Sequence, residues 1–158
     1  MATNSELGGA VDSTCATPRL VILTGLSGAG KSTAMRVFED LGYYCLDNLP
    51  PGLIPQFFAL YRQSGLLSRG VAIASDVRSG ALFGEFRNTV NALRESAILF
   101  SILYLDCASE ILVNRFKEVR RTHPLEPEFS LDAAIEEERQ RLAPIRELVT
   151  AVVDTSRL

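Results

Sequence analysis

Residues 25–32, which read Gly-Leu-Ser-Gly-Ala-Gly-Lys-Ser, constrain the fold of this chain more than any other segment. They fit G-x-x-x-x-G-K-[ST], the pattern of a phosphate-binding loop. Glycines let the main chain curl so that successive N–H groups point inward at an anion. The apolar run Leu20–Leu23 precedes the loop, and apolar residues at helical spacing follow it as far as Gly42. The segment therefore predicts a strand, a phosphate-holding loop and a helix in succession.

Each residue type in this loop has a chemical reason to be there. Lys31 is the predicted catalytic cation, because its ammonium would reach the β- and γ-phosphates of a nucleoside triphosphate. The Ser32 hydroxyl would ligate Mg²⁺, and the helix that follows would direct its positive end at the same phosphates. The predicted nucleotide ligands in this loop are Gly25, Leu26, Ser27, Gly28, Ala29, Gly30, Lys31 and Ser32.

Five strand-like runs alternate with helical patterns along the chain. This alternation predicts an α/β domain with a mostly parallel sheet of about five strands and helices on both faces. The expected strands are Leu20–Thr24, Tyr43–Leu46, Val71–Ser75, Ile98–Leu105 and Ala151–Val153. The expected helices are Lys31–Leu41, Leu53–Gln63, Ala81–Arg94, Ser109–Arg120 and Leu131–Leu148. Pro144 is expected to kink or split the last of these helices.

Aspartates follow four of the five predicted strands, where ligands of parallel sheets bind: Asp47, Asp76, Asp106 and, at the last strand, Asp154. Asp76 comes directly after Val71–Ser75 and is the best candidate for a catalytic carboxylate that holds Mg²⁺ together with Ser32. Asp47 competes for this role or binds a second substrate. Asp106 is a third candidate, but its position before a helix makes it look most like a cap.

Positive charge is concentrated ahead of a proline-rich loop. Arg115, Arg120 and Arg121 are candidates for a lid that would cover the phosphates and neutralise charge in the transition state. A solvated helix face explains the same residues equally well. His123, the single histidine of the sequence, is interpreted as a surface residue with a structural role. The run Glu136–Glu138 is interpreted as part of a solvent-exposed helix face.

Composition narrows the class of protein further. The net charge of −3 gives no support for a general nucleic-acid-binding surface. Cys15, Cys45 and Cys107 are widely spaced and form no C-x-x-C pair, which argues against a zinc site or disulfide framework and favours a reducing, cytoplasmic location.

No apolar run is long enough for a membrane helix. Residues 1–18 are small and polar, without the features of a secretory signal, and are expected to be a disordered extension ahead of a domain at 19–158.

Several longer strings make the chain resemble the amino-terminal domain of the RapZ/YvcJ family, bacterial P-loop nucleotide-binding proteins that include an RNase adapter. Besides the loop at 25–32, the matching strings are Glu39–Pro50, Ser75–Arg78, Arg120-Arg121 with His123-Pro124-Leu125, and Val153–Ser156. The resemblance covers the chain from about Arg19 to its end. The family also has a carboxyl-terminal domain, which nothing in this sequence matches; since the chain ends soon after its fifth predicted strand, a longer parent protein is expected.

The resemblance implies a P-loop kinase-like fold that binds ATP and GTP, with Mg²⁺, and hydrolyses them slowly as a regulatory module of an RNase adapter. It assigns Asp76, Val77, Arg78 and Ser79 to a second nucleotide-binding segment, for GTP; some relatives have Asn where this chain has Ser79. It also implies a homo-oligomer for the full-length protein. Contacts with RNA or an RNase are not carried over to this fragment, because the adapter role is tied to the carboxyl-terminal domain.

Three functions stay open at the level of sequence. The leading one is weak nucleoside triphosphate hydrolysis, with Lys31 and a Mg²⁺ ion near Ser32 and Asp76 spreading the developing charge. A small-molecule kinase is the alternative, because Asp47 and lid-like arginines would suit a phosphoryl acceptor. The third is a binding module in which the nucleotide only stabilises the fold. A phosphate loop reads the triphosphate and not the base, so the preference for ATP or GTP is open.

Overall fold

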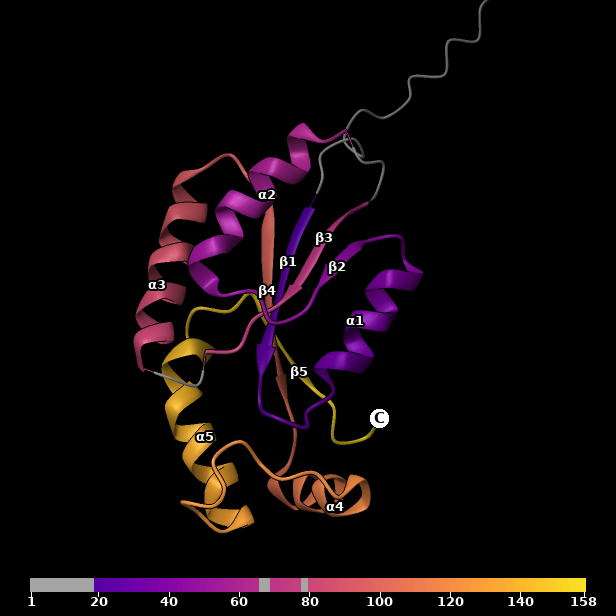
Figure 1. Ribbon diagram of the computed structural model, residues 1–158, viewed down its shortest axis with the longest axis vertical. Helices are drawn as coiled ribbons and strands as arrows, with labels where there is room; N and C mark the ends of the chain where they lie inside the picture. The colour runs from indigo at the N-terminus through magenta and orange to yellow at the C-terminus, as the bar shows by residue number, and fades with distance from the viewer. Residues whose placement is uncertain (1–18, 66–68, 78–79) are drawn as a thin grey trace, which may run out of the picture.

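A five-stranded parallel sheet forms the centre of the molecule (Figure 1). The computed structural model describes residues 19–65, 69–77 and 80–158, so the expected extension at 1–18 and the predicted ligands Arg78 and Ser79 lie outside the described residues. The strands are β1 (Arg19–Gly25), β2 (Tyr44–Leu46), β3 (Gly70–Ala74), β4 (Phe100–Asp106) and β5 (Ala151–Asp154). Their order across the sheet is β2-β3-β1-β4-β5, and every pairing is parallel. The predicted parallel sheet is confirmed.

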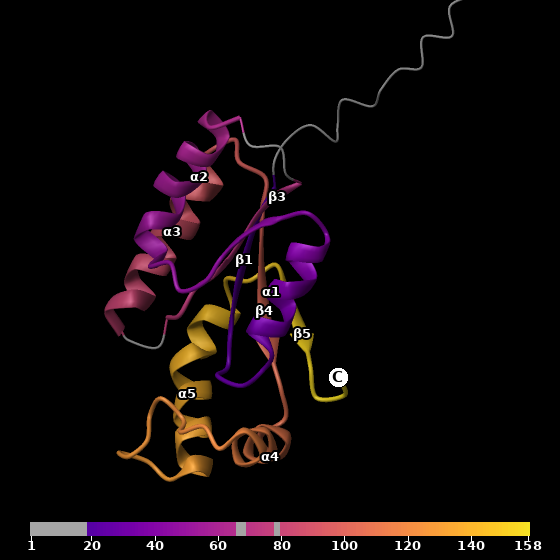
Figure 2. The same ribbon diagram turned by 45° about the vertical axis from the view of Figure 1, so that its right-hand side comes forward.

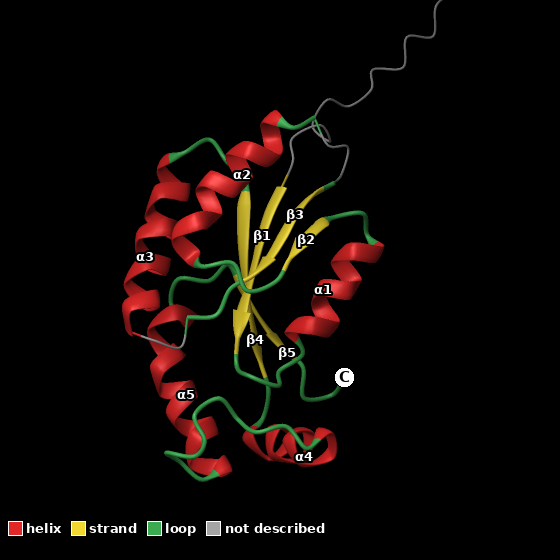
Figure 3. Ribbon diagram, in the orientation of Figure 1, coloured by secondary structure: helices red, strands yellow, loops and turns green. Residues whose placement is uncertain are grey.

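Helices cover both faces of this sheet, as predicted (Figures 2 and 3). They are α1 (Lys31–Asp40), α2 (Ile54–Gln63), α3 (Gly80–Glu95), α4 (Ser109–Val119) and α5 (Leu131–Arg146), with a short 3-10 helix η2 (Pro51–Leu53) ahead of α2. Helix α1 lies on one face, and α2, α3 and α5 lie on the other. Helix α4 lies beyond the carboxyl end of β4, at the edge of the sheet where ligands of such folds bind.

The side chains of β1 show why this strand is central. Leu20 and Ile22 belong to the large apolar core shared with α2, α3 and α5. Val21 and Leu23 point the other way, into a smaller cluster with Met35 of α1. Because both faces are covered, the strand is a continuous apolar run and not an alternating one.

Helix α5 contradicts one of the two expectations about Pro144, that it splits the helix. It continues as one element from Leu131 to Arg146 with Pro144 inside it, so the helix is not split. Pro144 lies two residues before the helix end, where the missing N–H removes a single helical hydrogen bond.

Candidate phosphate-binding site

The loop between β1 and α1 is a glycine-built curl. Gly25, Gly28 and Gly30 have φ values of 133°, 82° and 105°, a range that side chains other than glycine rarely adopt. Leu26 and Ala29 are fully buried beneath the curl, and the Leu26 amide donates to the Leu105 carbonyl on β4 at 3.2 Å. The two apolar side chains therefore anchor the loop to the core, while the glycines give it its curvature.

Helix α1 starts directly from this loop. Its N-cap is Gly30, which offers no side chain to bond the N–H groups of the first turn. These N–H groups and the positive end of the helix are what an anion binds at a helix N-terminus. The sequence of glycine, lysine and serine thus builds the local geometry that phosphate requires.

An open cleft of about 870 Å³ lies in front of the loop. This volume is within the range of sites that hold drug-sized ligands. The side chains that line it come from the loop, from the carboxyl ends of β2 and β3, and from the end of α4 and the segment after it. The predicted site residues among the lining are Gly25, Ser27, Gly28, Gly30, Lys31, Ser32, Asp47, Asp76, Arg115 and Arg121. Leu26, Ala29 and Val77 are buried behind it.

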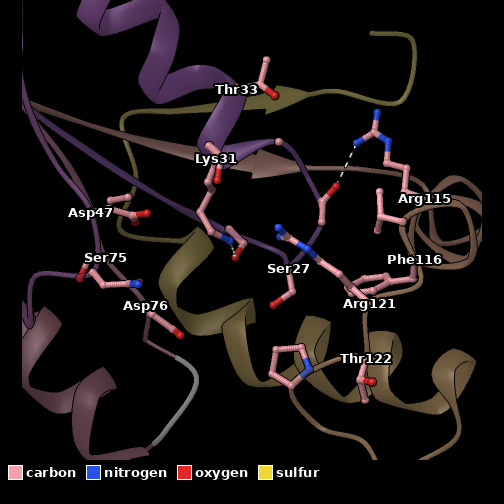
Figure 4. A pocket seen from close by; sticks show the side chains of 18 of the residues that line it. Ser27, Lys31, Thr33, Asp47, Ser75, Asp76, Arg115, Phe116, Arg121 and Thr122 are labelled. Carbon is pink, nitrogen blue, oxygen red and sulfur yellow. Dashed lines mark hydrogen bonds between the residues drawn. The ribbon is translucent and has the colours of Figure 1, made fainter.

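Lys31 lies at the centre of the cleft (Figure 4). Its Nζ donates to the Gly25 carbonyl at 2.8 Å and to the Leu26 carbonyl at 3.0 Å. The ammonium is thus held against the curl of the loop, where it would be a point charge for a bound phosphate.

Two carboxylates lie on one side of Lys31, and two guanidinium groups lie on the other (Figure 4). Asp47 follows β2 and Asp76 follows β3, and parallel strands bring their carboxyl ends to one edge of the sheet. Oxygen ligands of this kind suit Mg²⁺. Within the described residues, no group of three His, Cys, Asp or Glu side chains could hold a metal by itself. A cation here would therefore need oxygens of a bound phosphate in addition to Ser32 and one carboxylate.

The predicted lid arginines take different positions. Arg115 donates from Nη1 to the Gly28 carbonyl at 3.1 Å and from Nη2 to the Thr155 carbonyl at 2.6 Å, so it braces the loop. Arg121 is exposed at the cleft. Arg120 ends α4 in a left-handed conformation with φ of 50° and does not appear in the cleft lining.

Three residues behind the loop were missed or misread from the sequence. Thr155, just after β5, donates from Oγ1 to the Ala29 carbonyl at 2.6 Å. His123 and Glu138 are each only 1% exposed, so the interpretation of both as surface residues is wrong. The signal for Glu138 was present in the sequence: residues 134, 135, 138, 142 and 145 fall on one helical face, and all five are buried in α5.

Asp106 is another correction. The N-cap of α4 is Ala108, without a side-chain hydrogen bond, so Asp106 is not the helix cap. Its carboxylate instead pairs with Arg139 at 2.7 Å and Arg146 at 3.0 Å, both on α5. These pairs tie α5 to the end of β4. Burial, followed by the Asp106 charge, raises the pKa of the neighbouring Tyr104 to about 12.

Two of the three cysteines lie in the part of the chain that the structure describes. Cys107 is a buried free thiol and Cys45 a half-buried one, whereas Cys15 lies outside the described residues. Burial, with a smaller effect of the Glu39 charge, raises the pKa of Cys45, which disfavours its thiolate.

None of the helices within the described residues combines the length and the apolar character that a membrane span requires.

The strand order β2-β3-β1-β4-β5 with a glycine-rich loop between β1 and α1 defines a P-loop protein with a kinase-like fold. A sugar kinase from Janibacter sp. HTCC2649 shares it with a TM-score of 0.59 and 16% identity, over 87% of this chain and 86% of that one. Shikimate kinase from Acinetobacter baumannii has a TM-score of 0.56 and 16% identity, over 91% and 87%. At such identities the likeness concerns the fold alone.

Sequence relatives place the chain more narrowly. The family model of the RapZ-like N-terminal domain matches residues 19–158, and the chain belongs to this family, which confirms the resemblance drawn from the motifs. A protein of Clostridium beijerinckii is 44% identical over 139 residues, and one of Desulforamulus reducens is 47% identical over 139 residues. Both bear the name nucleotide-binding protein, and each match covers 88% of this chain and 47% of the relative. The chain thus spans about half the length of these curated relatives.

Proposed function

We propose that this domain binds ATP and GTP, with the phosphates of the nucleotide in the curl of residues 25–32. The observation that carries the proposal is the position of the Lys31 ammonium, held by the carbonyls of Gly25 and Leu26 at the centre of a cleft of about 870 Å³. The uncapped start of α1 adds N–H donors at the same place. The names of the relatives agree with a nucleotide as the ligand.

We extend the proposal to slow, Mg²⁺-dependent hydrolysis of the nucleotide. A Mg²⁺ ion bound by Ser32 and Asp76 would neutralise phosphate charge, and Lys31 would stabilise the charge that develops on the transferred phosphoryl group. Turnover would be slow because Arg115 is bonded to the main chain at Gly28 and Thr155. In related mechanisms, an arginine that reaches the transferred phosphoryl group increases the rate of hydrolysis roughly 10³–10⁵-fold.

Family membership supports further proposals for the whole protein. The domain would act as the regulatory nucleotide-binding module of a RapZ-like RNase adapter that is a homo-oligomer in the cytoplasm. Asp76 and Val77 would begin a second nucleotide segment that continues through Arg78 and Ser79. We propose no contact with RNA or an RNase for this chain itself, in keeping with its net charge of −3.

A small-molecule kinase is the second candidate. Asp47 and Asn48 follow β2 and line the same cleft as Lys31, where a phosphoryl acceptor with hydroxyl groups would meet the nucleotide. A screen of metabolites with radiolabelled ATP separates the two functions. One strongly preferred acceptor favours the kinase, and phosphate release to water alone favours the hydrolase.

Calorimetric titration with ATP and GTP, with Mg²⁺ and with a chelator, tests the proposed binding. We expect saturable binding that weakens by about tenfold or more when Mg²⁺ is removed. The cation neutralises the part of the phosphate charge that Lys31 alone leaves unneutralised. Phosphate release measured on the same samples reports turnover. Absence of heat with both nucleotides, in a sample shown to be folded by circular dichroism, contradicts the proposal.

A further inference from the structure

We infer that Glu138 and His123 are positioning residues for the phosphate loop: a buried carboxylate on α5, faced by a buried imidazole, fixes the loop through Ser27. The inference deepens the proposed function and rests on it. Glu138 does not appear in the cleft lining, so it would act through Ser27 and not on a bound nucleotide.

The contact between Glu138 and Ser27 is a two-point one. The Ser27 amide donates to Oε1 at 2.6 Å and the Ser27 hydroxyl donates to Oε2 at 2.6 Å, across 111 residues of sequence. Two bonds from one residue to one carboxylate fix both the position and the orientation of Ser27. Hydrogen bonds to a carboxylate are stronger than neutral ones, and a carboxyl group that is 1% exposed is costly to bury without such partners.

This contact also determines which part of the loop can bind phosphate. The Ser27 N–H is directed at Glu138, and the Ala29 N–H donates to the Leu26 carbonyl at 3.1 Å. A phosphate in the curl is therefore left with the remaining N–H groups of the loop and of the start of α1. The Ser27 side chain still borders the cleft, which makes it the link between the buried carboxylate and the ligand. Glu138 would thereby hold the loop open for phosphate before the nucleotide arrives, and preorganisation of this kind increases affinity.

His123 completes the arrangement. Its Nδ1 accepts a hydrogen bond from the Leu125 amide at 3.1 Å, which leaves Nε2 as the nitrogen that carries the ring proton. Nε2 lies 3.6 Å from Glu138 Oε1. Among the described residues, it is the one buried side-chain nitrogen or oxygen that has no hydrogen-bond partner. An N–H group this close to a buried carboxylate interacts favourably with its negative charge.

Packing holds the imidazole in this place. The Phe116 ring lies 5.2 Å from the His123 ring, centroid to centroid. The same ring would be 3.0 Å from a Cβ at Gly28 and also lines the cleft, so Phe116 packs against both the histidine and the loop. Phe116, His123 and Glu138 thus form one connected group of side chains that contacts the loop at Gly28 and Ser27.

The test compares the calorimetric affinity for Mg·ATP in Glu138→Ala, Glu138→Gln, Ser27→Ala and the Ser27→Ala/Glu138→Ala double variant. Glu138→Ala should weaken binding at least tenfold. Glu138→Gln should stay within about threefold of the parent, since the amide group can accept from the Ser27 N–H and donate to the Ser27 hydroxyl. The double variant should bind no more weakly than Glu138→Ala, because both changes remove the same contact. Glu137→Ala is the matched control and should bind like the parent, because the half-buried Glu137 pairs with Arg141 on the same helix rather than with the loop.

A readout without nucleotide separates this inference from the proposed function. Hydrogen exchange of the Ser27 amide should be at least tenfold faster in Glu138→Ala than in the parent, and His123→Gln, which retains an N–H near the Nε2 position, should protect it better than His123→Ala. If Glu138→Ala does not fold, the two His123 variants carry the same comparison. Equal exchange in all variants, or additive losses of affinity in the double variant, overturns the inference. A parent that protects Ser27 but binds no nucleotide overturns only the proposed function.

Discussion

Lys31→Ala is expected to abolish the nucleotide binding and hydrolysis that we propose, while the domain stays folded. The Lys31 ammonium is the cation held at the centre of the loop by the Gly25 and Leu26 carbonyls. Losing a charge-assisted contact to a triphosphate should weaken binding by about 100-fold or more, or roughly 3 kcal/mol. Calorimetry with Mg·ATP and Mg·GTP, with phosphate release on the same protein, measures both effects.

Lys117→Ala is the matched control for this prediction. Lys117 is the other lysine of the sequence and is exposed on α4, outside the cleft lining. The substitution removes the same charge as Lys31→Ala. It should leave the affinity for nucleotide within about twofold of the parent's, since an exposed charge contributes little. If Lys31→Ala bound and hydrolysed nucleotide like the parent, the assignment of residues 25–32 as the phosphate site would be wrong.

Gly25→Ala should produce the largest loss of stability among single substitutions in the loop. Gly25 has φ of 133°, and a Cβ there would lie 2.2 Å from the Leu105 carbonyl oxygen on the neighbouring strand β4. Neither main chain can move without breaking the pairing of the two strands, which are joined in the register Gly25 opposite Leu105. Backbone strain and overpacking together should lower the free energy of unfolding by about 2–5 kcal/mol. Urea denaturation followed by circular dichroism measures the change.

Gly84→Ala provides the opposite case. Gly84 lies in α3, is exposed, and has no atom within 4 Å of the position of an added Cβ. Alanine is the better helix former, so this variant should be more stable by about 0.5–1 kcal/mol. Equal midpoints of unfolding for Gly25→Ala and the parent would contradict the close approach of β1 and β4 at the loop.

Much of the fold could be read from the sequence because its signals are local. Strand β1 was expected at Leu20–Thr24 and spans Arg19–Gly25, and α1 begins at Lys31 as predicted. Apolar runs, helical spacing and glycines at turns act over a few residues, so they mark elements well and their ends less well. The meeting of Asp47 and Asp76 in one cleft followed from the parallel direction of their strands.

The misread residues share a physical reason. The position of Asp106 before a helix favours a cap, but its partners Arg139 and Arg146 come from α5. A lone histidine before a proline is typical of a surface loop, but Phe116 and Glu138 cover His123. In each case a contact distant in sequence outweighed the local preference.

The order of strand, glycine curl and helix, with a lysine and a serine placed for phosphate, is already present in residues 19–42. The contacts that support the curl arise only when distant segments pack together. Thr155 reaches the Ala29 carbonyl across 126 residues and Glu138 reaches Ser27 across 111. Backbone preferences and periodicity extend over one or two turns, whereas these contacts exist only after α5 and β5 have packed against the sheet.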